Sequence, residues 1–185
     1  MVKNRHTSLL EERGIELEKR MYERRSRYLI LFLTLNYKPE HRGRMTLDDL
    51  RGHRDRLLKN VQCNSLLGGI EAYIWKIEEG GVAGLHLHLL LFYSGERRGD
   101  VYIAKSIGEY WETTVTRGLG AYWSSNANKD RLVQRGRPVG VGQIDRGDVE
   151  GRAGILQIIR YLAEPGQEIG RVPGHSRTFG MSALP

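Results

Sequence analysis

The sequence contains one cysteine, Cys63, and no long hydrophobic segment. A lone cysteine excludes an intrachain disulfide, and this composition fits a reducing compartment. The longest apolar run, from Tyr28 to Leu35, is far shorter than the roughly 20 residues that a helix needs to cross a bilayer. The first residues lead into Glu-rich sequence without the apolar region of a signal peptide. We therefore expect a cytoplasmic protein with no membrane association.

Internal repeats and low-complexity segments are also missing, and the 185 residues suffice for one domain with a sizeable core. The formal net charge is +7, and residues 1–60 contain 15 Lys and Arg against 9 Asp and Glu. Basic proteins favour polyanionic partners because neutralised phosphates release their counterions. The charge therefore indicates a nucleic-acid partner contacted by the amino-terminal third, although a merely soluble basic protein has the same composition.

Four segments carry the apolar spacing and the boundary signals of helices. Ser8 and Glu11 have the form of a capping box before the first segment, and Thr46 opens the second. Asp100 is the expected N-cap of the third, and Pro165-Gly166 stops the fourth. The predicted helices cover residues 8–27, 46–61, 100–115 and 155–163.

Short apolar runs predict strands at residues 28–36, 70–79, 85–93 and 139–145. The second and third runs flank a Gly-rich stretch, which is the pattern of a β-hairpin. Residues 118–137 lack periodicity and are expected to form a long surface loop, and the tail from Gln167 is basic with spaced Gly and Pro. Hairpin strands mixed with helices predict an α+β fold with a central antiparallel sheet and helices packed on its faces.

The segment from Gly84 to Phe92 carries two histidines, His86 and His88, within an apolar run. Alternate side chains of a strand share a face, so both imidazoles lie on one side and the intervening leucines on the other. Two imidazoles on a rigid strand form a preorganised platform for a metal ion. The alternative is a polar pair on the solvated face of a sheet, but imidazoles in so apolar a run need partners.

A site with two histidines normally includes a carboxylate, and the preceding strand offers Glu78 and Glu79. Neighbouring strand residues face opposite sides, so only one of them can reach the histidines. Trp75 and Ile77 look like core residues, which places Glu78 on the opposite face. We favour Glu78 as the ligand, with a solvated turn carboxylate as the alternative.

Several segments together resemble the replication initiators of filamentous phages (inoviruses) and the YagK/YfjJ-type prophage domain. These proteins belong to the HUH endonucleases, named for the His-hydrophobic-His motif. The resemblance covers residues 28–182 and divides the chain into a basic amino-terminal helix, 1–27, and an HUH endonuclease-like domain, 28–185. The segments that carry it are 28–36, 73–78, 84–92, 107–111 and 177–182.

The resemblance implies a palm-like sheet, similar to that of RNA-recognition-motif folds, that holds Mg²⁺ or Mn²⁺ through Glu78, His86 and His88. It further implies a tyrosine that attacks a phosphate of single-stranded DNA. The family motif Tyr-x-x-Lys corresponds here to Tyr161 through Glu164, so Tyr161 is the expected nucleophile and Glu164 stands in place of the lysine. A buried helix aromatic is the alternative interpretation of Tyr161.

The activity implied by the resemblance is rolling-circle replication initiation. Such a protein nicks and joins single-stranded or hairpin DNA at an origin through a 5′-phosphotyrosine intermediate, and a host helicase is a further expected partner. Five basic residues are candidates for phosphate contacts, and two aromatic residues are candidates for stacking on bases. They are Arg24, Arg25, Arg27, Lys129 and Arg160, and Tyr122 and Trp123. For the arginines at the end of the first helix, a solvated face that complements the helix dipole is the alternative.

Two further functions compete with DNA cleavage. Gly80 followed by His86 and His88 matches the start of a cupin metal motif. The carboxylate that should follow is missing, however, because Phe92 and Tyr93 stand there and helices interrupt the strands. The other alternative is a cleavage-deficient regulator of replication that binds single-stranded DNA with the same fold, which Glu164 in place of lysine favours.

Overall fold

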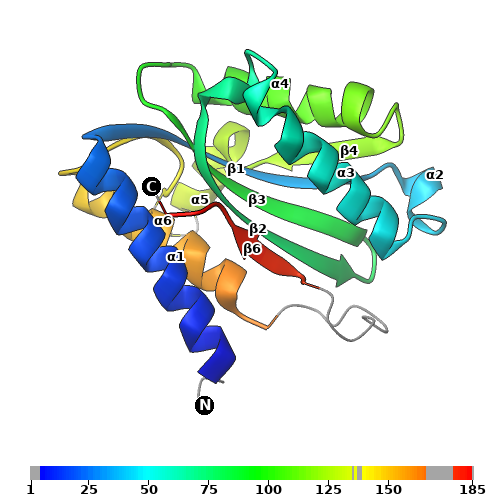
Figure 1. Cartoon of the computed structure of the whole chain (residues 1–185), viewed down its shortest axis with the longest axis horizontal. Helices are drawn as coiled ribbons and strands as arrows, with labels where there is room; N and C mark the ends of the chain where they lie inside the picture. Colours follow the sequence, from blue (N-terminus) through cyan, green and yellow to red (C-terminus); the bar gives the residue numbers. More distant parts are fainter. Residues whose placement is uncertain (1–4, 135, 137–138, 166–176, 185) are drawn as a thin grey trace.

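An open antiparallel sheet forms the centre of the molecule (Figure 1). The computed structural model describes residues 5–134, 136, 139–165 and 177–184. Within these residues the strands follow the order β4-β1-β3-β2-β6, and β5 pairs with the free half of β1. Their bounds are β1 Arg27–Tyr37, β2 Ile70–Gly80, β3 Gly84–Ser94, β4 Gly120–Ser124, β5 Gly142–Asp145 and β6 Phe179–Met181. The predicted α+β class with a central antiparallel sheet is confirmed.

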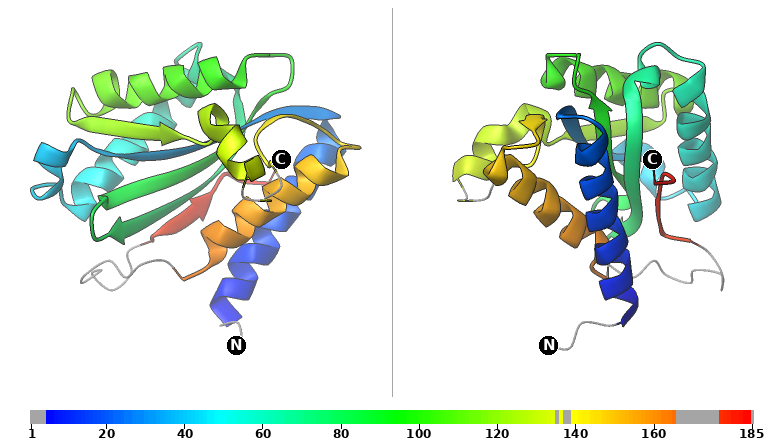
Figure 2. Two further views of the ribbon diagram at one scale, coloured as in Figure 1. Left: turned by 180° about the vertical axis from the view of Figure 1, so that it is seen from behind. Right: turned by 60° about the vertical axis from the view of Figure 1, so that its left-hand side comes forward.

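Helices cover both faces of this sheet (Figure 2). The helix bounds are α1 Arg5–Arg24, α2 Pro39–Arg42, α3 Leu47–Lys59, α4 Asp100–Tyr110, α5 Lys129–Gln134 and α6 Val149–Ala163. On one face, α3 and α4 pack over a core that includes Leu87 and Leu89, as expected for the residues between the histidines. On the other face, α1 and α6 pack over Ile74 and Leu90. Among the described residues, none of these helices combines the length and the hydrophobicity needed to cross a lipid bilayer.

The amino-terminal helix α1 is part of the second core. Leu17 and Met21 are fully buried against the sheet and α6. Glu18 is buried as well, and both of its carboxylate oxygens accept hydrogen bonds from Arg152 of α6, at 2.7 and 2.8 Å. The apolar stripe of α1 therefore holds α6 on the sheet, and α6 carries the carboxyl-terminal part of the candidate site.

The helix starts agree with the sequence at one position and differ at three. Thr46 and Asp49 form the capping box expected at the start of α3. The capping box at Ser8 was wrong, because α1 begins at Arg5 and Ser8 lies inside the helix. Asp100 is the first helical residue of α4, and Gly99 occupies the cap with a φ of 82°. Finally, α6 begins at Val149, six residues before the predicted start, because Asp148 caps it by accepting from the Gly151 amide.

Two short strands lie where the sequence predicted none. The expected loop over 118–137 contains β4 and α5, and the tail contains β6, so that loop prediction was wrong. Strand β4 pairs with the carboxyl-terminal half of β1, and β6 pairs with β2. Such short strands are stabilised by a partner distant in sequence rather than by their own periodicity. Residues 135 and 137 of the predicted loop, and residues 167–176 and 185 of the predicted tail, lie outside the described residues.

Asn126 fills the gap between β4 and β5 along β1. Its Oδ1 accepts from the Phe32 amide at 3.0 Å, and its Nδ2 donates to the Ile30 carbonyl at 2.9 Å. The buried amide thus satisfies backbone groups of β1 that neither neighbouring strand reaches. As a result, β1 stays continuous across the sheet and holds Thr34 beside the histidines of β3.

Candidate metal centre

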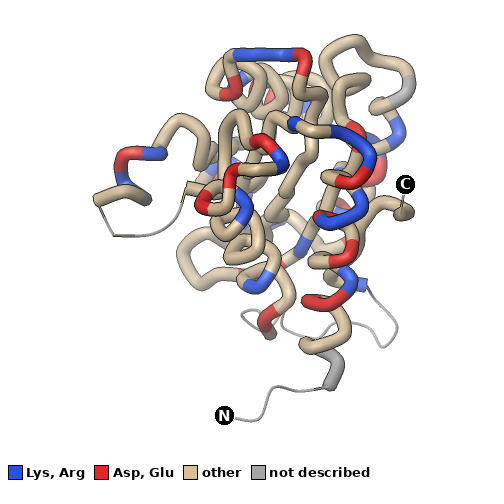
Figure 3. Tube along the Cα trace, turned by 90° about the vertical axis from the view of Figure 1, so that its left-hand side faces the viewer, with Lys and Arg blue, Asp and Glu red and all other residues tan. Residues whose placement is uncertain are grey.

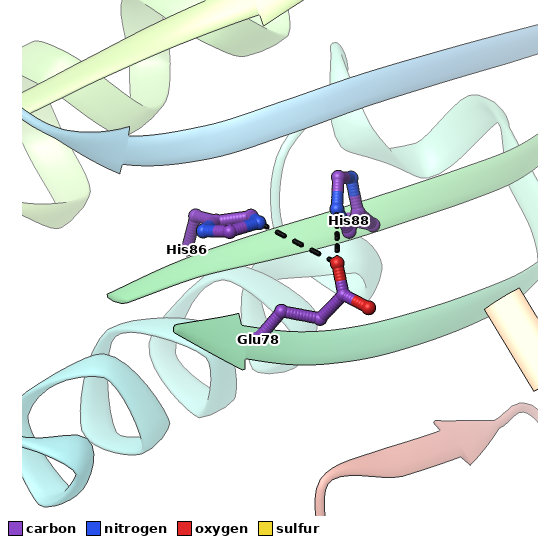
Figure 4. Close-up of side chains that lie close together, drawn as sticks. All are labelled: Glu78, His86 and His88. Carbon is purple, nitrogen blue, oxygen red and sulfur yellow. Dashed lines mark hydrogen bonds and ion pairs between the residues drawn. The ribbon is translucent and has the colours of Figure 1, made fainter. Parts of the chain in front are cut away.

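Glu78, His86 and His88 meet on one face of the β2–β3 hairpin (Figure 4). The hairpin turn ends at Gly84, whose φ of 65° lies in the left-handed region that favours glycine. This turn sets a register in which Glu78 lies directly opposite His86. Because alternate residues share a face, His88 lies on that side as well. The parity argument for Glu78 over Glu79 therefore agrees with the register.

The three side chains are close enough to share one ion. Glu78 Oε2 lies 3.0 Å from His88 Nε2 and 3.6 Å from His86 Nε2. One donor atom from each residue lies within 4.8 Å of the others, and all three residues are buried. Such a group of two imidazoles and a carboxylate can hold a metal ion.

Both imidazoles are held through Nδ1, so that Nε2 of each ring points at Glu78. His86 Nδ1–H donates to the Gly84 carbonyl at 2.9 Å, which turns Nε2 toward the Glu78 carboxylate. His88 Nδ1 lies 3.1 Å from Thr34 Oγ1, and the Phe32 ring stacks on the imidazole with a centroid distance of 6.0 Å. Histidines that bind metals are usually oriented in this way through their second nitrogen. The surrounding contacts therefore fit a metal centre.

The electrostatics of the cluster favour ligation by Glu78 and His88. Burial alone would raise the pKa of Glu78, but hydrogen bonds from His86, His88 and Lys76 outweigh it and hold this pKa well below its usual range. Burial lowers the pKa of His88. At His86 burial acts in the same direction, but the hydrogen bonds to Glu78 and to the Gly84 carbonyl, together with the charge of Glu78, outweigh it and raise the pKa. Glu78 is thus ionised and His88 neutral at neutral pH, which are the protonation states that bind a cation.

Lys76 is a member of the site that the sequence prediction did not assign. It lies two residues before Glu78 on β2, opposite His88, and its Nζ is 2.6 Å from Glu78 Oε1. The ammonium also donates to the Glu164 carbonyl at 2.7 Å. Its place on the face of Glu78 followed from strand parity, but the packing of α6 over that face did not.

Tyr161 of α6 reaches the same cluster. Its hydroxyl oxygen lies 3.0 Å from His88 Nε2 and 3.3 Å from Glu78 Oε2, and its ring packs edge-on against that of His88. Burial, followed by the nearby charge of Glu78, raises the pKa of Tyr161 to about 12. The side chain is nevertheless 42% exposed, so Tyr161 is not a buried core aromatic.

Glu164 lies at the end of α6 and in the wall of the same cleft. It is the C-cap residue, with extended backbone, because Pro165 follows it and disfavours a helical conformation. Glu164 therefore does not continue the helix face of Tyr161, as its spacing of three residues would suggest, although both residues line one open cleft of about 470 Å³. Lys76, Glu78 and both histidines also line this cleft.

The basic residues predicted to contact DNA do not gather at this cleft. Four of them are paired with carboxylates, and Arg24 is exposed at the end of α1. Along α1 itself, acidic and basic residues alternate (Figure 3). The four pairs are Arg25 with Glu71, Arg27 with Asp145, Lys129 with Asp100 and Arg160 with Glu11.

The two predicted stacking residues, Tyr122 and Trp123, lie on opposite faces of β4. Tyr122 packs against the core beneath α4. Trp123 is 42% exposed and lies opposite Thr34, which in turn lies opposite His88. Directly opposed residues of antiparallel strands share a face, so Trp123 is on the face of the candidate site.

The comparisons with known proteins were negative throughout. No protein family model, no curated protein and no solved structure matches the chain.

Proposed function

We propose that this protein is a metal-dependent endonuclease of the HUH type that nicks and rejoins single-stranded DNA with Tyr161. The observation that carries the proposal is the position of the Tyr161 hydroxyl, 3.0 Å from His88 Nε2 and 3.3 Å from Glu78 Oε2. A phenol beside a candidate metal centre, in an open cleft, is the arrangement that phosphodiester transesterification requires.

Tyr161 is the nucleophile in the proposed reaction. Tyr161 Oη attacks the phosphorus, the bond to the 3′ oxygen breaks, and a 5′-phosphotyrosine forms. The phenol releases its proton to water, which reaches the half-exposed ring, and the departing 3′ oxygen takes one up. Attack by that 3′ hydroxyl on the phosphotyrosine reverses the step and joins the ends, because a phenolate is a good leaving group.

Glu78, His86 and His88 would hold a divalent cation, for which we propose Mg²⁺ or Mn²⁺. When bound, the cation polarises a non-bridging phosphate oxygen and offsets its negative charge. Two imidazole ligands favour Mn²⁺ over Mg²⁺, since Mg²⁺ prefers oxygen ligands.

Single-stranded DNA is the proposed substrate because an exposed aromatic ring shares the face of the cleft. Trp123 lies two strands away from His88, with Thr34 between them, and can stack on an unpaired base. With the resemblance to phage replication initiators, this supports a cytoplasmic initiator of rolling-circle replication. Its proposed substrate is an origin presented as a single strand or hairpin, and a host helicase is a further proposed partner.

The test is formation of a covalent adduct. The protein is incubated with labelled single-stranded oligonucleotides and Mn²⁺, and the products are separated on a denaturing gel. We expect a protein–DNA adduct that disappears in Tyr161→Phe and persists in Tyr102→Phe, which removes a hydroxyl from an exposed tyrosine on α4. An adduct that survives in Tyr161→Phe would exclude this tyrosine as the nucleophile.

A cleavage-deficient regulator that binds single-stranded DNA is the second candidate. It is favoured by Glu164, whose carboxylate lines the cleft and would repel a phosphate. Oligonucleotide binding without an adduct, for every substrate and metal tested, would support this function over the nuclease.

A further inference from the structure

Lys76 carries a buried charge that the proposed chemistry does not by itself explain. Its side chain is only 8% exposed and lies between β2 and the end of α6. An ammonium group taken out of water is costly unless it is paired and hydrogen-bonded. The groups that contact the Lys76 ammonium should therefore indicate its role.

All of the partners of Lys76 belong to the candidate site or to the helix that carries Tyr161. Its Nζ lies 2.6 Å from Glu78 Oε1, and it donates to the carbonyls of Glu164, at 2.7 Å, and Tyr161, at 3.4 Å. An ammonium has three protons to donate, so these acceptors match its capacity. Lys76 thus joins a proposed metal ligand to the last turn of the nucleophile's helix.

The sequence of α6 explains why those carbonyls need an external donor. In a helix, the Tyr161 carbonyl would accept from the amide four residues later, but that residue is Pro165, which has no N–H. The last carbonyls of a helix also carry partial negative charge and are stabilised by a nearby cation. Lys76 supplies both the missing donor and the charge.

We propose that Lys76 is a positioning residue, which holds the last turn of α6 against Glu78 and so keeps the Tyr161 hydroxyl beside His88. This role rests on the proposed function, because it assigns Lys76 to the transesterification at the same site. Lys76 touches neither the phosphate nor the attacking oxygen in this scheme. It acts through the backbone of α6 and through the Glu78 carboxylate.

The central variant is Lys76→Met, which keeps the length of the side chain and removes both the charge and the donors. The first measurement is amide hydrogen exchange of the last turn of α6, including the Glu164 amide that donates to the Arg160 carbonyl. The second is the single-turnover rate of adduct formation at saturating oligonucleotide and Mn²⁺. The matched control is Lys105→Met, which removes an exposed lysine paired with Glu109 on α4.

We expect faster exchange in the last turn of α6 and a rate of adduct formation about 100-fold lower in Lys76→Met, since small displacements of a reacting group cost about that much. Lys105→Met should change neither quantity. Unchanged exchange in Lys76→Met would overturn the positioning role, and so would faster exchange with an unchanged rate.

A second variant separates positioning from a purely electrostatic effect. Pro165→Ala restores an N–H for the Tyr161 carbonyl. The double variant Lys76→Met/Pro165→Ala should therefore regain protection from hydrogen exchange in the last turn of α6 and part of the rate of adduct formation. If protection returned without any increase in that rate, the charge of Lys76 alone would matter, and the proposal would be overturned. If the wild-type protein forms no adduct at all, the proposed nuclease function fails, whereas the exchange data still report separately on the contact between Lys76 and α6.

Discussion

The hydroxyl oxygen of Tyr161 lies 3.0 Å from Nε2 of His88, although 73 residues separate the two in the sequence. The contact joins α6 to β3 and depends on the packing of α1 and α6 over this face of the sheet. It places the half-exposed phenol of Tyr161 directly beside the candidate ligands. Four predictions test what this arrangement does.

Replacing either histidine of the candidate metal centre by alanine should weaken Mn²⁺ binding at least about 10-fold, because removing a group that merely orients a metal ligand commonly costs that much. Isothermal titration calorimetry measures the affinity. The control is His53→Ala, which removes an imidazole on α3 that contacts Tyr37 on the opposite face of the sheet. Unchanged Mn²⁺ affinity in both His86→Ala and His88→Ala would show that these histidines are structural.

Thr34→Val should weaken Mn²⁺ binding about 10-fold while leaving the direct ligands in place. The Thr34 hydroxyl lies 3.1 Å from His88 Nδ1, and valine has nearly the same shape without a hydrogen-bonding group. The imidazole would then lose the contact that orients Nε2. The same calorimetric titration measures the effect, and an affinity equal to wild type would contradict a role for Thr34 in orienting the ring.

Glu78→Gln should destabilise the protein by about 3 kcal/mol at neutral pH, because it leaves the buried Lys76 ammonium without its carboxylate. Since the folded-state pKa of Glu78 is lowered, its contribution is present above the ordinary value of 4.5 and is lost as the pH falls through the folded-state value. Urea unfolding measures the free energy of unfolding of the wild type and of Glu78→Gln from neutral pH down to about pH 3. The difference between these two free energies should narrow as the pH falls.

The control for this pH dependence is Glu109→Gln, which breaks an exposed pair with Lys105. Exposed ion pairs contribute at most about 1 kcal/mol to stability, so the free energy of unfolding of this variant should depend on pH as that of the wild type does. If the free energies of unfolding of Glu78→Gln and wild type instead diverged toward acidic pH, this would contradict the lowered pKa of Glu78.

Glu164→Lys should strengthen oligonucleotide binding about tenfold, which corresponds to about 1.4 kcal/mol. The substitution replaces a negative charge in the wall of the cleft by a positive one, and it should steepen the salt dependence of binding. Fluorescence anisotropy at several salt concentrations measures both. The hydrogen bonds of Glu164 with Arg160 and Lys76 use its backbone, so the stability should stay unchanged. Weaker binding would show that DNA does not approach this wall.

Much of the fold and part of the site could be predicted because they depend on neighbours along the chain. Alternation placed His86 and His88 on one face and selected Glu78 over Glu79, and the Gly-rich turn joined the two strands. The capping box of α3 was equally local, since Thr46 and Asp49 satisfy each other's backbone amides. Strand alternation and the three-residue spacing of a capping box predict these contacts without reference to the rest of the molecule.

The remaining features depend on which distant segments pack together. Strands β4 and β6 pair with β1 and β2 across long stretches of chain, and their own residues show little periodicity. The carboxylates opposite Arg25, Arg27, Lys129 and Arg160 come from other elements, so the sequence could not show that these cations are paired. Composition alone therefore overstates the positive charge available at the surface.

Strand parity and a short turn are enough to bring the candidate ligands Glu78, His86 and His88 together and to place Lys76 on the same face, because all four lie on one hairpin. What surrounds these residues depends on the packing of the whole molecule, since Tyr161 reaches them through α6 and Thr34 through the pairing of β1. The two kinds of contact differ in the range of the interactions behind them. Backbone alternation acts between adjacent residues, whereas burial of apolar faces selects contacts between any two elements that can cover one another.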